Sequence, residues 1–430
     1  MDYLGVWCYI SFQETQQLLL KSDLINMNNT LEKTYNYIGF LICLSIPFMT
    51  YAKAFVNICM ICLFLILVVL PNKQKALEII KNNFFKTFLI FLLFVTLFTV
   101  FNSSFFLDFS ETRKIAQIAL LFILFSFVND KRFLIYGFIL GVFISSLITG
   151  INIINYYLNS FELLISKSSI EDLFITQRLY LGFFTVISAI LLFNIYQTSI
   201  NNVQKYSSLL LIIYFLFVLF LISSRSALLI AVVVFLTTII HELKPQHSFL
   251  LVVGAVLIFS SIIYTNKNLS NRFLYSEDSI RSSFIDKIKT HEPRYDIWKF
   301  SGQIFKEEKP YFFGIGTFKT QELLVSKYQL MPIEKRKNWF IERNFNTHNQ
   351  YIDITISYGI IGLLIFLVFV KETVKFSLKN IHSLNLVLSL LLFLLVENIF
   401  HRQLGSFIFA LTLVLALFLI KSKNEKNINC

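Results

Sequence analysis

The sequence has few charged residues for its length. Among its 430 residues, 15% are charged and 56% are hydrophobic, whereas about half of a soluble globular domain is apolar and roughly a quarter is charged. The uncharged residues are gathered in blocks of about 16 to 22, close to the length of a helix that crosses a bilayer core. Apolar side chains occupy every side of these blocks, with no polar stripe. This pattern excludes a soluble globular protein.

Cysteine is also scarce. The five cysteines are Cys8, Cys43, Cys59, Cys62 and Cys430. None lies in the long polar stretch 265–349, so no disulfide framework holds that stretch. Cys59 and Cys62 form a CxxC inside an apolar run without a second pair of ligands, which favours packing over a zinc or redox site. The first 26 residues lack the basic-then-apolar order of a signal peptide, and Met27 is an alternative start.

The apolar blocks predict an all-α integral membrane protein with about 12 transmembrane helices. We expect the spans near 37–53, 54–71, 84–101, 114–128, 133–155, 179–196, 207–222, 225–241, 248–264, 350–370, 383–400 and 405–420. The chain then divides into an N-terminal segment 1–36, helices one to nine in 37–264, one large loop 265–349, the last three helices in 350–420 and a tail 421–430.

Lysine and arginine in the short connections indicate the orientation. They are about twice as frequent on the side that the two termini share, which places both termini in the cytoplasm and the loop 265–349 outside. The formal net charge of +12 follows from these topology-determining lysines and the anionic bilayer surface. No basic helix or stacking platform accompanies the charge, so nucleic acid is not an expected partner.

The large extracytoplasmic loop is predicted to contain short helices. Pro293 suits a first helical turn, and apolar residues recur at helical spacing after it. We therefore expect a helix that Arg294 opens and that ends near Lys309-Pro310. The following Gly314-Ile315-Gly316 is expected to form a tight turn, because no strand–turn–helix unit surrounds it to make a nucleotide site.

The arginines are distributed differently from the lysines. Arg178, Arg225 and Arg402 all lie at predicted outer ends of helices, whereas the inner connections contain mainly lysine. The planar guanidinium suits phosphate and carboxylate groups. A lone arginine beside an apolar helix costs free energy unless it is paired with an anion or has a functional role. The pattern points to an anion site at the outer rim.

Three further polar residues lie near this rim. His348 precedes an apolar helix, where a histidine is either a simple interfacial residue or a functional one. Glu397 interrupts a predicted span, which is costly and usually functional, and His401 would share its helical face four residues on. Arg402 follows directly. A structural salt bridge closing the bundle and a functional cluster both remain open.

The order of these motifs resembles the O-antigen ligase and polymerase superfamily, over roughly 170 to 405. The matching segments are Gln177-Arg178-Leu179-Tyr180-Leu181-Gly182, Ser223-Ser224-Arg225-Ser226, Arg294-Tyr295-x-x-Trp298, Pro310, Gly314-Ile315-Gly316, Asn346-Thr347-His348-Asn349-x-Tyr351 and Tyr358-Gly359-Ile360-Ile361-Gly362. Each motif is short, so their order, their spacing and the helix count carry the resemblance.

The resemblance implies a multi-pass glycosyltransferase of the bacterial inner (plasma) membrane whose active site faces the periplasm. Such enzymes move a glycan from undecaprenyl diphosphate to lipid A core or another glycan, in lipopolysaccharide biosynthesis, without a cofactor or an essential metal. His348 becomes a candidate general base, since histidine changes charge near neutral pH. Arg178, Arg225 and Arg294 become candidate diphosphate or glycan ligands, with Glu397, His401 and Arg402 in support.

Two alternatives are carried forward. A polysaccharide polymerase that extends the lipid-linked glycan shares the same motifs. A polytopic transporter or flippase belongs to a different class, and tends to show two related halves with charges near the bilayer midplane. Here the charges gather at one face and one loop is far longer than the rest. These features favour the transferase over the transporter.

Overall fold

The computed structural model describes residues 27–428, except 71, 103, 104, 161–167, 243–250 and most positions between 252 and 282. Every regular element within the described residues is helical. Residues 27–45 form the first helix. The elements after it are η1 (Ile46–Phe48), α2 (Met49–Val69), α3 (Lys73–Lys81), α4 (Asn83–Phe101), α5 (Phe105–Phe127), α6 (Arg132–Ser160), η2 (Ser168–Leu173), α7 (Arg178–Thr198), α8 (Asn202–Ile222), α9 (Arg225–Glu242), α12 (Phe284–His291), α13 (Pro293–Glu308), α14 (Thr317–Gln329), α15 (Glu334–Arg343), α16 (Gln350–Ser377), α17 (Ile381–Leu394), η3 (Ile399–His401) and α18 (Gln403–Ile428).

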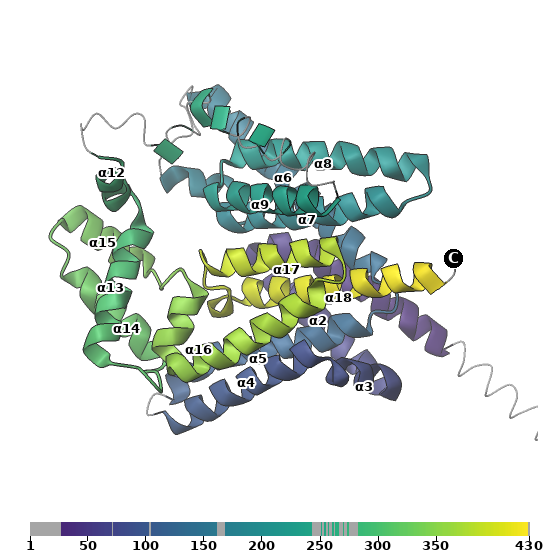
Figure 1. Cartoon of the computed structure of the whole chain (residues 1–430), viewed down its shortest axis with the longest axis horizontal. Helices are drawn as coiled ribbons and strands as arrows, with labels where there is room; N and C mark the ends of the chain where they lie inside the picture. The colour runs from purple at the N-terminus through teal and green to yellow at the C-terminus, as the bar shows by residue number, and fades with distance from the viewer. Residues whose placement is uncertain are drawn as a thin grey trace, which may run out of the picture.

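The long helices lie side by side in one bundle, and α12 to α15 pack together at one end of it (Figure 1). Eight helices among the described residues are long and apolar enough to cross a membrane. The predicted all-α, multi-pass membrane class is therefore confirmed. The number of about 12 spans stays a prediction, partly because the expected span 248–264 lies largely outside the described residues.

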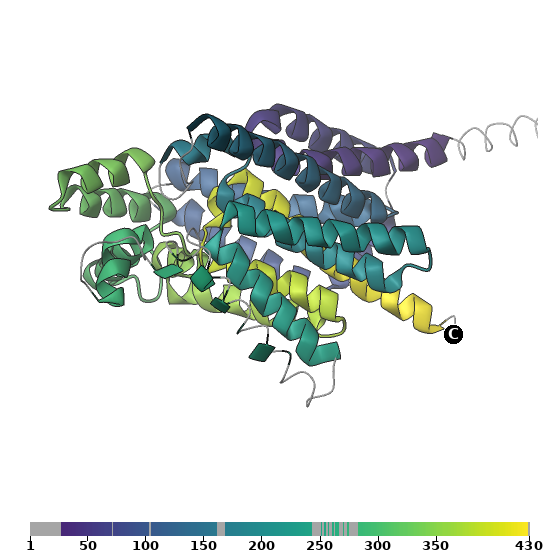
Figure 2. The same cartoon turned by 90° about the horizontal axis from the view of Figure 1, so that it is seen from above.

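The helical run Met27–Val69 is one of the eight candidates, 43 residues long. It does not run straight, because Tyr35 and Leu67 line the same small pocket. A straight helix would separate these two residues by about 48 Å. The chain reverses near η1, and the two purple helices lie next to each other in Figure 2. The backbone is also non-helical at Ala52 inside α2, so the reversal extends from η1 to Ala52, next to the predicted boundary at 53–54.

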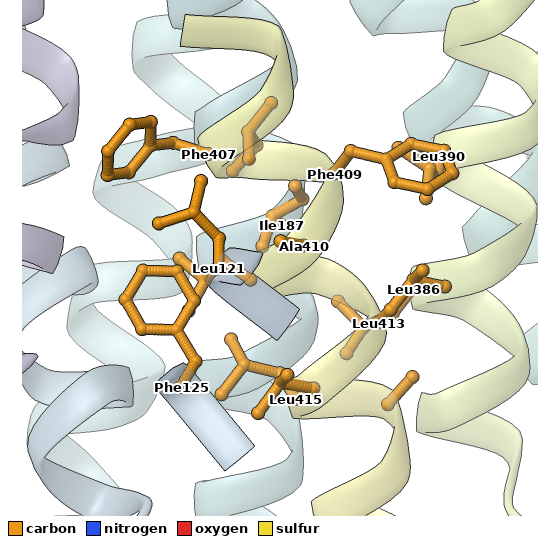
Figure 3. Packing of buried hydrophobic residues seen from close by; sticks show 14 of the residues in the cluster. Leu121, Phe125, Ile187, Leu386, Leu390, Phe407, Phe409, Ala410, Leu413 and Leu415 are labelled. Carbon is orange, nitrogen blue, oxygen red and sulfur yellow. The ribbon is translucent and has the colours of Figure 1, made fainter. Parts of the chain in front are cut away.

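Apolar packing between α5, α7, α17 and α18 forms the centre of the bundle. Figure 3 shows leucine and phenylalanine side chains of these helices interleaved with Ile187 and Ala410, and all of them are buried. Helix α18 is buried along most of its candidate span. A helix that is apolar on every side can occupy such a central position.

Helix α16 is broken at Gly359, where φ is 74° and ψ is −177°. This conformation is essentially restricted to glycine. A break leaves main-chain groups without helical partners, which is costly in an apolar surrounding. The segment 311–316 supplies those partners: the N–H groups of Ile315 and Gly316 donate to the carbonyls of Ile356 and Ser357, at 3.1 and 3.0 Å.

The same segment also accepts from the second half of the helix. The N–H groups of Ile360 and Ile361 donate to the carbonyls of Tyr311 and Phe312, at 3.0 and 3.4 Å. A Cβ atom at Gly314 would lie 2.1 Å from the main chain of Ser357, so this approach requires glycine. The predicted tight turn at Gly314–Gly316 is wrong, because these residues run against α16 and form no turn.

One short helix, α13, begins and ends where expected. Helix α13 has Pro293 in its first turn, Arg294 next to it, and Lys309 as its C-terminal cap, which confirms the prediction for this helix. Helix α14 begins beside α5, where Asp108 accepts hydrogen bonds from the Thr317 hydroxyl at 2.8 Å and the Phe318 N–H at 2.7 Å. A carboxylate at a helix N-terminus satisfies unpaired N–H groups and complements the helix dipole.

Candidate functional site

At the end of the bundle where α12 to α15 pack, a cationic or titratable side chain lies at or just before the start of several helices. Arg178 opens α7, Arg225 opens α9, and Arg294 is the second residue of α13. His348 lies two residues before α16, and Arg402 directly precedes α18. Helix N-termini carry partial positive charge and attract anions. Clustered arginines strengthen that attraction.

Arg225 and Arg294 are connected through α13. The Arg225 guanidinium forms an ion pair with Glu292, the N-terminal cap of α13. Arg294 donates from Nη2 to the carbonyl of Val396 at 3.1 Å. Burial lowers the pKa of Arg294, although Glu397 and Glu292 oppose this and Arg225 adds to it. Two guanidinium groups thus lie around one pair of carboxylates, Glu292 and Glu397.

The segment Asn346-Thr347-His348-Asn349 holds its histidine in an uncommon backbone conformation. The φ angle of His348 is 44°, a region that non-glycine residues rarely adopt. Asn346 stabilises it by accepting from the His348 N–H at 3.1 Å. Asn349 then caps α16 by accepting from the N–H groups of Tyr351 and Ile352. Strained backbone at a polar cluster is typical of a functional site.

His348 is paired with Glu397. Its Nδ1 lies 3.0 Å from Oε2 of Glu397, and the side chain of Glu397 is only 3% exposed. The other carboxylate oxygen lies 3.4 Å from Nε of Arg402. Burial alone would raise the pKa of Glu397, but the hydrogen bond and charge of His348 and the charges of Arg402 and Arg294 hold it below its usual value. Glu397 is therefore an anion that orients the imidazole.

The helical placement of Glu397 and His401 predicted from the sequence is wrong. Helix α17 ends at Leu394, Glu397 lies in non-helical chain, and His401 ends a short 3-10 helix. The unwound chain exposes main-chain groups that find partners in the site, such as the Phe400 N–H, which donates to Gln350 at 3.0 Å. We call residues 395–402 the Glu397 loop.

His401 faces other carboxylates. Its Nε2 lies 2.8 Å from Oδ2 of Asp353, and its Nδ1 lies 3.6 Å from Oε2 of Glu111. Lys114 donates to Glu111 at 2.7 Å and to the carbonyl of His401 at 2.8 Å. The sequence analysis singled out neither Glu111 nor Lys114. The signal was present, since charges in the first turns of an otherwise apolar helix require partners.

Arg178 lies beside this arrangement. Its guanidinium stacks over the ring of Phe174 at 5.1 Å, while the preceding Gln177 accepts a hydrogen bond from Arg402. Arg402 also lies over the ring of Tyr180, at 5.8 Å. The structure thus connects His348, Glu397 and Arg402 directly. Arg178 follows Gln177, the residue that Arg402 contacts.

Several buried polar atoms around His348 have no hydrogen-bond partner within the described part of the chain. They are Nε of Arg294, Oδ1 of Asn398 and the hydroxyl of Tyr180. Buried polar groups are nearly always satisfied, so these atoms indicate a polar ligand or ordered water. The described residues contain no group of three or more His, Cys, Asp and Glu side chains arranged to hold a metal ion.

Residues 210–367 match a family described as O-antigen ligase. This segment is similar to the members of that family. The match confirms the resemblance to the O-antigen ligase and polymerase superfamily. No curated protein matches the chain.

The O-antigen ligase segment runs from α8 into α16. It contains Arg225, Arg294 and His348, and it includes the helices α12 to α15. Glu397 and Arg402 lie after the segment, in the chain that folds back onto it. Members of the family are glycosyltransferase-type enzymes, so enzymatic function is supported.

Proposed function

We propose that this protein transfers a glycan from undecaprenyl diphosphate to lipid A core or a similar acceptor, at the periplasmic face of the bacterial inner membrane. His348 is the general base, and Arg178, Arg225 and Arg294 bind the diphosphate or the adjoining sugar. The reaction in this proposal uses the side chains of the protein, with no cofactor. Membrane lipids surround the bundle, and the lipid-linked donor reaches the site from them.

The pairing of His348 with Glu397 among arginines is the observation that carries the proposal. Nδ1 of His348 faces the carboxylate, so an Nδ1–H tautomer leaves Nε2 free to accept a proton. Guanidinium groups at Arg225 and Arg294 lie within the same cluster of charges. A base and preorganised cations are the two elements that glycan transfer from a lipid diphosphate requires.

The chemistry proceeds by one displacement. The acceptor hydroxyl oxygen attacks the anomeric carbon of the donor sugar while Nε2 of His348 takes the hydroxyl proton. The bond between that carbon and the diphosphate oxygen breaks, and undecaprenyl diphosphate leaves with the electron pair. The arginines stabilise this charge as it develops, so they lower the free energy of the transition state more than that of the bound substrate.

The test replaces His348 with Ala in the intact protein. Purified variant is supplied with lipid-linked glycan extracted from the native bacterium's membranes, and glycan on the acceptor is measured. Transfer should fall by at least about 100-fold, the usual contribution of a general base, with unchanged abundance in the membrane. Replacement of the exposed His241, which lies at the other end of α9, is the control. Near-normal transfer by His348→Ala would refute the proposal.

A polymerase that extends the lipid-linked glycan is the second candidate, because the residues of the O-antigen ligase segment suit either acceptor. Deletion of the gene separates the two. Lipid-linked polymer that accumulates without reaching lipopolysaccharide indicates a ligase. Single repeat units on the surface indicate a polymerase.

A further inference from the structure

We infer that His401 is a positioning residue for this reaction: it holds the Glu397 loop against α5 and α16, so that Glu397 meets His348 in the geometry that transfer requires. The inference rests on the proposed function. It assigns His401 a role apart from Glu397, through a second set of charged partners.

The first argument is the double anchoring of the imidazole. One ring nitrogen contacts Asp353 on α16 at 2.8 Å, and the other faces Glu111 on α5 at 3.6 Å. The Asp353 side chain is 4% exposed, while those of His401 and Glu111 are 16% and 20% exposed. A single side chain thus connects two helices to the loop that carries Glu397.

The second argument is that Asp353 also reaches the His348 segment. The Thr347 hydroxyl lies 3.4 Å from Asp353 and accepts from Asn398 at 2.6 Å. Gln350 lies 3.5 Å from the same carboxylate. The chain around His348 and the chain around Glu397 are therefore fixed to one common carboxylate. A shift of either segment changes the pairing of imidazole and carboxylate.

The third argument concerns charge. Burial alone would lower the pKa of His401, but Asp353 and then Glu111 raise it to about 9, against a smaller opposing effect of Lys114. Arg402 and Glu397 are the other charged groups on the same loop. A raised pKa means that His401 is protonated at neutral pH, and that its ion pairs are lost as the pH rises through about 9. Transfer should therefore decline in that range.

The experiment measures transfer between pH 6.5 and 10 for the wild type and for His401→Gln, with lipid-linked glycan from native membranes. We expect kcat of the variant to fall by about 10- to 100-fold, as misplaced catalytic groups cause. Its remaining activity should lack the decline near pH 9. Binding of undecaprenyl diphosphate should stay within about twofold, because the arginines that bind it are retained.

Glu111→Gln is the second variant, and it serves if His401→Gln does not fold. Loss of one neighbouring carboxylate lowers the pKa of His401, so the alkaline decline should move to lower pH. His241→Gln, at an exposed position, should leave the profile unchanged.

The outcomes separate the two proposals. A wild-type kcat in His401→Gln, or an alkaline decline that stays at the same pH in both variants, overturns the positioning role. If the positioning role is overturned in this way but His348→Ala loses transfer, the proposed function still holds. Unimpaired transfer in His348→Ala would refute both the proposed function and the positioning role of His401.

Discussion

The carboxylate of Glu397 illustrates how much a single residue contributes at this site. One of its oxygens faces the imidazole of His348, and the other faces Arg402. An orienting carboxylate fixes the tautomer of its histidine and stabilises the imidazolium that forms after proton transfer. An amide of the same shape offers neither the charge nor the same hydrogen bonding.

Replacement of Glu397 with Gln should therefore lower kcat by about 100- to 10,000-fold. The variant should retain affinity for undecaprenyl diphosphate, because the three arginines remain. Single-turnover transfer and binding of undecaprenyl diphosphate, measured on the same preparation, check this. Glu322→Gln, at an exposed position on α14, is the matched control. Equal kcat in both variants would contradict the role of Glu397.

The types of residues at the site were predictable from the sequence, but their pairing was not. Arginines at helix ends and a buried carboxylate are costly in an apolar chain, so their presence alone is informative. Helical periodicity placed Glu397 beside His401. The chain instead unwinds after Leu394, and Glu397 pairs with His348, 49 positions earlier. Local spacing contains no information about a partner so distant in the chain.

At the scale of elements, the break in α16 is the feature that sequence patterns describe least well. Gly359 and Gly314 were visible as glycines, but their mutual approach depends on tertiary structure. A Cβ at Gly359 would lie 2.3 Å from the carbonyl oxygen of Phe312. Helix α13 was predicted well from the helical spacing of its apolar residues, and α7 from the length of its apolar run.

Gly359→Ala should destabilise the protein by about 1 to 3 kcal/mol or more, since it adds a steric clash to a backbone conformation that alanine avoids. Thermal unfolding in detergent measures this. Gly302→Ala provides the contrast, because a Cβ at this position of α13 meets nothing within 4 Å. That change should raise stability by about 0.5 to 1 kcal/mol. A similar midpoint for the two variants would contradict the strained break.

At the scale of the whole molecule, the two ends of the bundle are built from different parts of the chain. The start of the first described helix and the end of α18 lie at the end opposite α12 to α15 (Figure 1). The lysine bias predicts a shared side for the two termini. Which membrane face each end occupies remains the prediction that both termini are cytoplasmic.

Cysteine labelling tests that orientation. In a variant without the native cysteines, Asn338→Cys on α15 should react with a membrane-impermeant maleimide in intact spheroplasts. Lys73→Cys at the start of α3 should react only after permeabilisation. Both positions are exposed, so access across the membrane decides the result. The opposite pattern would place His348 in the cytoplasm, where the proposed transfer does not occur.

The hydrogen bonds between 311–316 and α16 also bear on how the protein is made. Residues 311–316 precede α16 in the chain, so they leave the ribosome before the helix that needs them. When α16 enters the bilayer, the partners for its unpaired main-chain groups have already been synthesised, and the cost of bare peptide groups in lipid is avoided. The order of translation thus matches the order in which the two segments depend on each other.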